Sequence, residues 1–276
     1  MAGGDDGAGA VITGPSGMAD WGFVDDAELE RIVVVSPHLD DAVLSCGQVL
    51  AAHPGATVVS VFTGTPAAYP DPPGWWSRLC GFGPGDDVMA VRKDEDLRAL
   101  AELGAEHVWL DFVEAHFDPD APVPSTTELA DRLDEALRGL HPTLVLLPFG
   151  LANPEHVATH DAGLVVRARW VAASPGGAGP VAWCCYEDLG YHQIPGQLAW
   201  RVATLFKAGL WPTPAAMPTD PSTERKRAAL ACYESQLRGL EADWRLARRL
   251  DAPTPEQIWR LAPPPSGWEA MIDLVP

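Results

Sequence analysis

The sequence predicts an α/β protein with an open, mostly parallel sheet and helices on both faces. Short runs rich in β-branched residues alternate with longer segments of helical periodicity, which is the order of parallel βαβ units. The runs are continuously apolar, as expected for strands that are covered on both faces. With 276 residues and 47% hydrophobic content, the chain can bury one large core. We therefore expect a single domain over residues 21–276.

The expected elements follow one another along the chain at βαβ spacing. Strands are expected at 32–35, 57–62, 107–110, 143–147 and 181–186. Helices are expected at 41–52, 88–103, 126–140, 156–172 and 224–250, the last broken near Gly239. Residues 1–20 are rich in Gly, Ala and Asp, so we expect a disordered or loosely attached segment there.

The segment 64–87 is a long connection crowded with Pro and Gly, and it contains Trp75 and Trp76. Connections of this length within a compact domain are usually functional. Because the segment follows a strand, we expect it to be an active-site loop. Its two tryptophans can stack on a sugar ring of a substrate, or they can anchor the loop onto the domain.

Composition excludes several classes of function. The formal net charge of −19 opposes nucleic acid as a partner, because Lys and Arg supply most of the attraction to a polyanion. The five cysteines show no paired metal spacing and do not indicate a disulfide framework. Neither a signal peptide nor a transmembrane segment is recognisable, so we expect a cytoplasmic location.

A cluster of His38, Asp40 and Asp41 directly follows the first strand. Ligands in open α/β sheets gather outside the carboxyl ends of the strands, so these residues lie where such a fold places its chemistry. A sharp turn into the next helix can bring His38 and Asp41 together. They then offer the nitrogen and oxygen ligands that Zn²⁺ accepts.

A third ligand is expected beyond another strand, because a catalytic zinc site usually has three protein ligands and an open position. The strand at 143–147 is followed by His156 and, one helical turn later, His160. His156 is nearer the strand end and is the better ligand, whereas His160 can orient a neighbour or touch substrate. Asp40 can act as general base towards a water that the metal acidifies.

The helix at 88–103 places charged residues on its apolar side. Arg92 and Asp96 are four residues apart and can pair. An inward-facing charged pair costs desolvation, so it is expected to line the substrate pocket or to brace the edge of the sheet.

These motifs resemble the LmbE-like, or PIG-L, family of zinc-dependent N-deacetylases. The resemblance rests first on Pro37-His38-Leu39-Asp40-Asp41 with Gly47. It extends to 61–64, to Arg92 with Glu95 and Asp96, to 186–191, and to Lys226 with 233–236. The resemblance implies one Rossmann-like domain with one Zn²⁺ held by His38, Asp41 and His156, with Asp40 as base and Arg92 binding substrate. It further implies hydrolysis of the acetyl group from an N-acetylglucosamine-type sugar conjugate, a small-molecule substrate.

One departure from the family pattern concerns catalysis. The family's second segment commonly reads His-Pro-Asp-His, whereas this chain has Asn153-Pro154-Glu155-His156. The first family histidine is credited with supporting the tetrahedral intermediate. Asn153 can donate a hydrogen bond there but cannot carry a charge, and His160 can take over part of the role.

Two other classes of function remain open at this point. Asn153 allows a catalytically weakened protein that keeps the fold and binds sugar or metal. Two histidines and one carboxylate also satisfy the ligand pattern of iron oxygenases, although these are expected on double-sheet β architectures. A nucleotide-binding function is set aside, since neither Gly-x-Gly-x-x-Gly after the first strand nor a phosphate-binding loop is present.

Overall fold

The computed structural model describes residues 22–118, 124–174, 181–250 and 256–262. Its strands are β1 Ile32–Ser36, β2 Thr57–Ser60, β3 Glu106–Trp109, β4 Leu144–Pro148, β5 Ala182–Tyr186, β6 Trp211–Ala215 and β7 Ile258–Ala262. Its α-helices are α1 Asp41–Ala52, α2 Trp75–Leu79, α3 Val88–Leu103, α4 Thr126–Leu140, α5 Pro154–Ala173, α6 Gln197–Lys207, α7 Glu224–Ala231, α8 Glu234–Trp244 and α9 Leu246–Leu250. The expected segment 1–20 lies outside the described residues.

The strands form a seven-stranded mixed sheet in the order β3-β2-β1-β4-β5-β7-β6. The first five strands are parallel, and β7 runs antiparallel to both β5 and β6. The chain proceeds outward from β1 to β2 and β3, and then returns to β4 on the other side of β1. This reversal creates a topological switch point between the carboxyl ends of β1 and β4, which is the position where open α/β sheets bind ligands.

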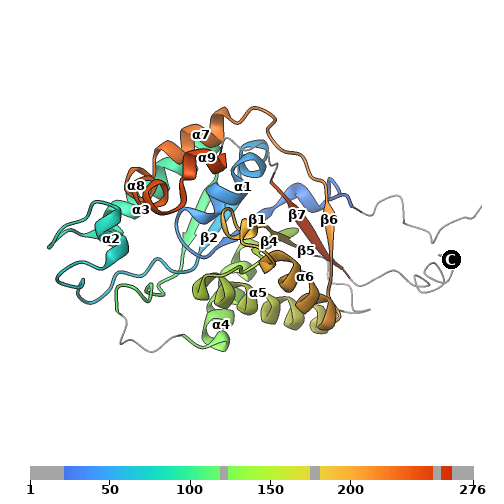
Figure 1. Cartoon of the computed structure of the whole chain (residues 1–276). Helices are drawn as coiled ribbons and strands as arrows, with labels where there is room; N and C mark the ends of the chain where they lie inside the picture. The colour runs from blue at the N-terminus through green and yellow to red at the C-terminus, as the bar shows by residue number, and fades with distance from the viewer. Residues whose placement is uncertain (1–21, 119–123, 175–180, 251–255, 263–276) are drawn as a thin grey trace, which may run out of the picture.

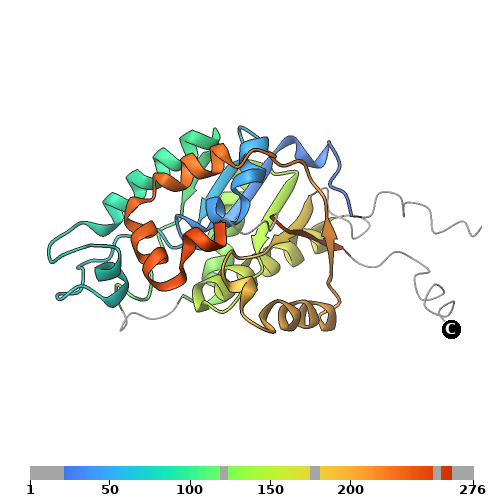
Figure 2. The same cartoon turned by 45° about the horizontal axis from the view of Figure 1, so that its top comes forward.

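Alternate side chains of the central strands point to opposite faces of the sheet and pack into two separate hydrophobic cores. Ile32 and Val34 of β1 pack with α1, α3 and α7, whereas Val33 and Val35 pack with α4 and α5. Figure 1 shows the corresponding layers, with α4, α5 and α6 below the sheet and α1, α3, α7, α8 and α9 above it. Figure 2 shows α7 running alongside α3, two helices that are far apart in the sequence. The predicted single α/β domain with helices on both faces is confirmed.

The predicted strands and most predicted helices are observed, but two strands and two helices were not foreseen. The edge strand β6 carries Pro212 and Pro214, which weaken its sequence signal and are tolerated because an edge strand has unpaired positions. Helices α2 and α6 also lay outside the prediction. The expected break at Gly239 was wrong, because Gly239 lies within α8 and the helix at 224–250 is interrupted at Cys232–Tyr233 and at Arg245.

Helix α1 is broken in its middle, and a buried ion pair stabilises the break. Cys46 has non-helical dihedrals, φ −129° and ψ 17°. The Glu256 carboxylate accepts hydrogen bonds from the backbone nitrogens of Gln48 and Val49, at 2.8–3.0 Å. Lys226 Nζ donates to the Leu44 carbonyl and to Glu256, both at 2.7 Å. The ion pair therefore satisfies the backbone groups that the break in α1 exposes.

Gly47 is required at this break by a close approach. A Cβ atom at position 47 would lie 2.7 Å from Lys226 Cγ. The first half of α1, which begins at Asp41, is thereby fixed against α7 by direct contact as well as by hydrogen bonds.

Replacing Glu256 with Gln is expected to lower the free energy of unfolding by about 3 kcal/mol, because it leaves a buried ammonium without its counter-ion. Urea unfolding of the two proteins measures the difference. Asp94→Asn is the matched control, since the Asp94–Arg98 pair is largely exposed and such pairs contribute about 0–1 kcal/mol. Equal losses in the two variants would contradict the role assigned to Glu256.

Candidate metal and active site

The turn between β1 and α1 is fixed by local hydrogen bonds that leave one aspartate free. Ser36 Oγ donates to the His38 carbonyl at 2.6 Å and accepts from the Ala42 nitrogen at 2.9 Å. The His38 nitrogen donates to Asp41 Oδ2 at 3.0 Å. Asp40 occupies the N-cap position of α1, yet its side chain makes no capping hydrogen bond. Its carboxylate lines the cavity described below.

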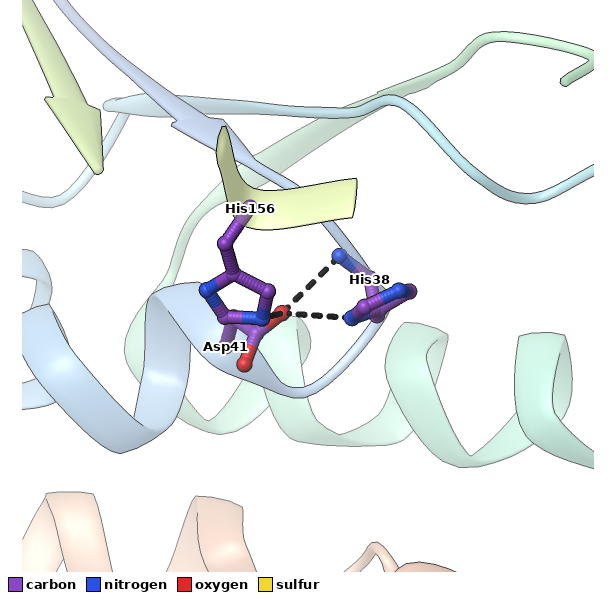
Figure 3. A group of neighbouring side chains, drawn as sticks. All are labelled: His38, Asp41 and His156. Carbon is purple, nitrogen blue, oxygen red and sulfur yellow. Dashed lines mark hydrogen bonds and ion pairs between the residues drawn. The ribbon is translucent and has the colours of Figure 1, made fainter. Parts of the chain in front are cut away.

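His38, Asp41 and His156 converge at the switch point (Figure 3). Asp41 Oδ2 lies 3.0 Å from His38 Nδ1 and 3.1 Å from His156 Nε2. One ligand atom from each of the three residues lies within 4.8 Å of the others. Two imidazole nitrogens and one carboxylate oxygen at this spacing form a group that can hold a metal ion, and the composition of the group suits zinc.

The two imidazole rings are each oriented by a second carboxylate. His38 Nε2 lies 2.8 Å from Glu155 Oε2, and His156 Nδ1 lies 2.6 Å from Asp188 Oδ1. Such outer carboxylates fix the ring orientation and the tautomer that leaves the inner nitrogen available to a metal. Neither Glu155 nor Asp188 was predicted from the sequence to take part in the site. Asp188 follows the carboxyl end of β5, so the strand-end rule could have found it.

Charge around the three ligands favours a cation. Burial alone lowers the pKa of His156, but the Asp41 charge and the Asp188 hydrogen bond raise it to about 9. Burial also opposes the charged form of His38, whereas Glu114, Asp41 and Glu155 raise its pKa above the usual value. The pKa of Asp41 is held well below its usual range despite burial, because both histidines lie against it. A divalent ion would supply the positive charge that this group demands.

Arg92, expected to pair with Asp96, pairs instead with Glu114. The Arg92 guanidinium donates a hydrogen bond to Glu114 Oε1, and Glu114 Oε2 lies 3.2 Å from His116 Nδ1. Glu114 also forms a possible metal group with His38 and Glu155. That second group is the poorer site, because Arg92 already neutralises Glu114 and the Ala115 nitrogen donates to Glu155 at 2.7 Å.

Asn153 and His160 do not lie together at the cavity, because only Asn153 lines it. Asn153 caps α5, where its Oδ1 accepts from the Glu155 nitrogen at 2.8 Å, and its Nδ2 lies 3.4 Å from the Tyr191 hydroxyl. Both Asn153 and Tyr191 line the cavity. His160 does not, since it is fully buried and its Nδ1 donates to the Pro148 carbonyl at 2.7 Å. Burial, together with the Arg201 charge, lowers the pKa of His160 to about 3.

A cavity of about 470 Å³ is lined by His38, Asp41 and His156. It lies within the range of small-molecule sites, about 300–1,000 Å³. The expected substrate residues Arg92, Trp75 and Trp76 all line it. Trp76 Nε1 donates to Gln236 Oε1 at 3.2 Å, and a Cβ atom on Gly239 would lie 3.0 Å from the Trp76 ring. Trp76 therefore anchors the 64–87 segment to α8, while Trp75 remains 57% exposed.

Asp96 supports the turn between β1 and α1 through Tyr233. The Tyr233 hydroxyl lies 2.8 Å from the Leu39 carbonyl and 2.7 Å from Asp96 Oδ1, and Trp109 Nε1 donates to Asp96 Oδ2 at 2.9 Å. A hydroxyl has one hydrogen, so both Tyr233 contacts are hydrogen bonds when the Asp96 carboxyl is protonated and donates. Burial raises the pKa of Asp96 to about 7, which agrees with this arrangement.

Asp96→Asn is expected to make stability less dependent on pH, because an amide reproduces the hydrogen bonds of the protonated acid. Folding raises the pKa of Asp96, so the free energy of unfolding of the wild-type protein falls as pH rises from the unfolded-state pKa towards 7. Denaturant unfolding at pH 5 and pH 8 should show the variant gaining about 2–3 kcal/mol relative to wild type over that interval. A constant difference between the two proteins would refute the protonated carboxyl.

Asp188→Asn is expected to weaken metal affinity by about 10–100-fold while leaving the fold intact, because it removes the charge that orients His156. Competition with a chromogenic chelator measures the affinity. Asp161→Asn, also on α5, is the control, since Asp161 is half exposed and its ion-pair partner is Arg201, at 3.7 Å. Unchanged affinity in Asp188→Asn would show that the 2.6 Å contact contributes nothing to metal binding.

Comparisons with known proteins agree with this geometry. Residues 33–167, which contain all three ligands, match the PIG-L family, described as GlcNAc-PI de-N-acetylase. The 2'-N-acetylparomamine deacetylase of Streptomyces fradiae is 34% identical over 176 residues. That match covers 58% of this chain and 57% of the relative, so it spans little more than half of each protein.

Solved structures extend the likeness over most of the chain. The A40926 pseudoaglycone deacetylase Dbv21 is 27% identical with a TM-score of 0.67, covering 86% of this chain and 98% of that one. The zinc inhibited form of teicoplanin deacetylase Orf2 is 26% identical with a TM-score of 0.68, covering 86% and 99%. Within the described residues, no helix is both long and apolar enough to span a membrane. Residues 33–167 of this chain therefore carry a PIG-L family domain, and the proteins to which the chain is similar are deacetylases of the LmbE/PIG-L type.

Proposed function

We propose that the chain is a metal-dependent amidohydrolase that removes the acetyl group from an N-acetylglucosamine-type sugar conjugate. The observation that carries the proposal is the convergence of His38, Asp41 and His156 beside an uncapped, cavity-facing Asp40. The relatives named above are deacetylases, one of an N-acetylated paromamine and two of glycopeptide antibiotics or their pseudoaglycones. Their reactions are consistent with the cavity's chemistry.

The proposed cofactor is one Zn²⁺, held by His38, Asp41 and His156. Two neutral imidazoles and one carboxylate leave a coordination position open, as catalytic zinc sites do. When bound, zinc supplies Lewis acidity that polarises a carbonyl and acidifies water. Glu155 and Asp188 keep both rings in position for it.

Asp40 is proposed as the general base. Its carboxylate is buried at the cavity wall, and burial together with the Asp41 charge raises its pKa to about 6. It remains mostly ionised at neutral pH while being basic enough to accept a proton from the attacking water. The same carboxyl can then return the proton to the departing amine. Arg92, fixed by Glu114, is placed to bind polar groups of the substrate in the cavity.

A catalytically weakened protein of the same family is the second candidate, and a specific observation favours it. The Asn153 side chain is already engaged by the α5 cap and by Tyr191. At most one N–H of its amide is left to stabilise a developing oxyanion, and the amide carries no positive charge. Turnover measurements separate this candidate from an ordinary deacetylase.

Asp40→Asn is expected to retain the metal but to reduce turnover by at least about 100-fold, the usual contribution of a general base. His156→Ala should lose metal and activity together. Metal content by atomic emission and amine release from N-acetylglucosamine conjugates measure both properties. Wild-type turnover in Asp40→Asn would sink the assignment of the base, and full metal occupancy in His156→Ala would remove that residue from the ligand set.

A further inference from the structure

The cavity over the proposed metal site is acidic. It is lined by the carboxylates of Asp40, Asp41, Glu114, Glu155 and Asp243. Among the described lining residues, Arg92 is the single Lys or Arg side chain, and Glu114 neutralises it. His38 and His156 are each held between two carboxylates. A divalent ion offsets two negative charges, so the cavity stays negative after a metal binds.

Asp243 is the acidic residue of the cavity whose negative charge is not paired with a positive group in the described part of the chain. It lies on α8 at the rim, exposed to solvent, and its carboxylate makes no hydrogen bond or ion pair within the described part of the chain. The other four carboxylates belong to the ligand set, the base or the pairs around it. Asp243 is therefore the acidic group available to a ligand that enters the cavity.

Trp75 is exposed on the same cavity wall and is held by a fixed neighbour. Its ring packs edge to face on Trp76, with centroids 5.5 Å apart. Trp76 in turn is bound to Gln236 and packs at Gly239, both on the helix that carries Asp243. The rim thus combines an exposed indole, whose face attracts cations, with an uncompensated carboxylate.

We infer that this rim, formed by Trp75 and Asp243, is a subsite for a second, already free amino group of the substrate, so that the substrate class is cationic amino-sugar conjugates. This inference rests on the proposed deacetylase function. A sugar ring places its apolar face on Trp75, and its ammonium group pairs with Asp243. Anionic conjugates such as phosphate esters are disfavoured, because the cavity and the net charge of −19 both repel them.

The test compares three glycosides of N-acetylglucosamine that differ in one group, with ethyl, 2-aminoethyl and 2-phosphoethyl aglycones. With the zinc-loaded enzyme at low ionic strength, kcat/KM should be roughly tenfold higher for the aminoethyl than for the ethyl glycoside, and lowest for the phosphoethyl glycoside. The preference should shrink as salt is added, because the rim is exposed and its charge is screened. Equal values for the ethyl and aminoethyl glycosides overturn the inference while leaving the deacetylase function intact.

Asp243→Asn should reduce the aminoethyl-to-ethyl ratio towards one. Glu106→Gln removes the same charge from the exposed edge strand β3 and should leave the ratio as in wild type. A ratio that falls equally in both variants would show a general charge effect and overturn the subsite.

A binding measurement separates the two proposals. Zinc-loaded Asp40→Asn is titrated with the three glycosides by calorimetry, which requires no turnover. Tighter binding of the aminoethyl glycoside supports the subsite, whether or not the wild type hydrolyses it. If the wild type hydrolyses none of the three glycosides, the deacetylase function alone is overturned. Hydrolysis of all three with indistinguishable affinities overturns the subsite alone.

Discussion

One oxygen atom, Asp41 Oδ2, links the parts of the site. It accepts from the His38 backbone nitrogen and faces His38 Nδ1 and His156 Nε2, all at 3.0–3.1 Å. The single carboxylate thereby fixes the turn after β1, the start of α1 and the start of α5. A buried carboxylate is costly unless positive charge surrounds it, so the site requires either protonated rings or a cation.

The sheet topology makes this arrangement possible. The order of strands reverses between β1 and β4, so these two strands are neighbours in the sheet. His38 and His156 follow their adjacent ends and lie close together, although they are 118 residues apart in the sequence. The next strand, β5, delivers Asp188 to the outer side of His156. The connection after β3 delivers Glu114 to Arg92 on the opposite side. The polar groups of the site therefore come from four segments, which follow β1, β3, β4 and β5.

The sequence was sufficient for the central sheet and for the convergence of His38, Asp41 and His156, because both follow from short-range patterns. Continuous apolar runs marked β1, β2, β4 and β5, and the strand-end rule placed His38, Asp41 and His156 together. Edge strand β6 was not predicted because its two prolines are typical of a loop sequence. The orientation of His160 was not predictable, because helical spacing cannot tell whether a side chain faces the cavity or the Pro148 carbonyl. Glu155 and Glu114 contact partners that are remote in sequence, which no local pattern encodes, whereas only the position of Asp188 after a strand could have pointed to it.

The break in α1 has a consequence for how the chain reaches its native state. His38, Asp41 and His156 all lie within residues 33–167. The groups that hold them in place, Asp188, Tyr233 and Glu256, come later in the chain. Loop closure over such separations is slow and becomes favourable only when the distant contacts form. During synthesis the ligand-bearing half therefore emerges before its supports. The segment that matches the family model thus depends on contacts from later residues to hold His38, Asp41 and His156 in this arrangement.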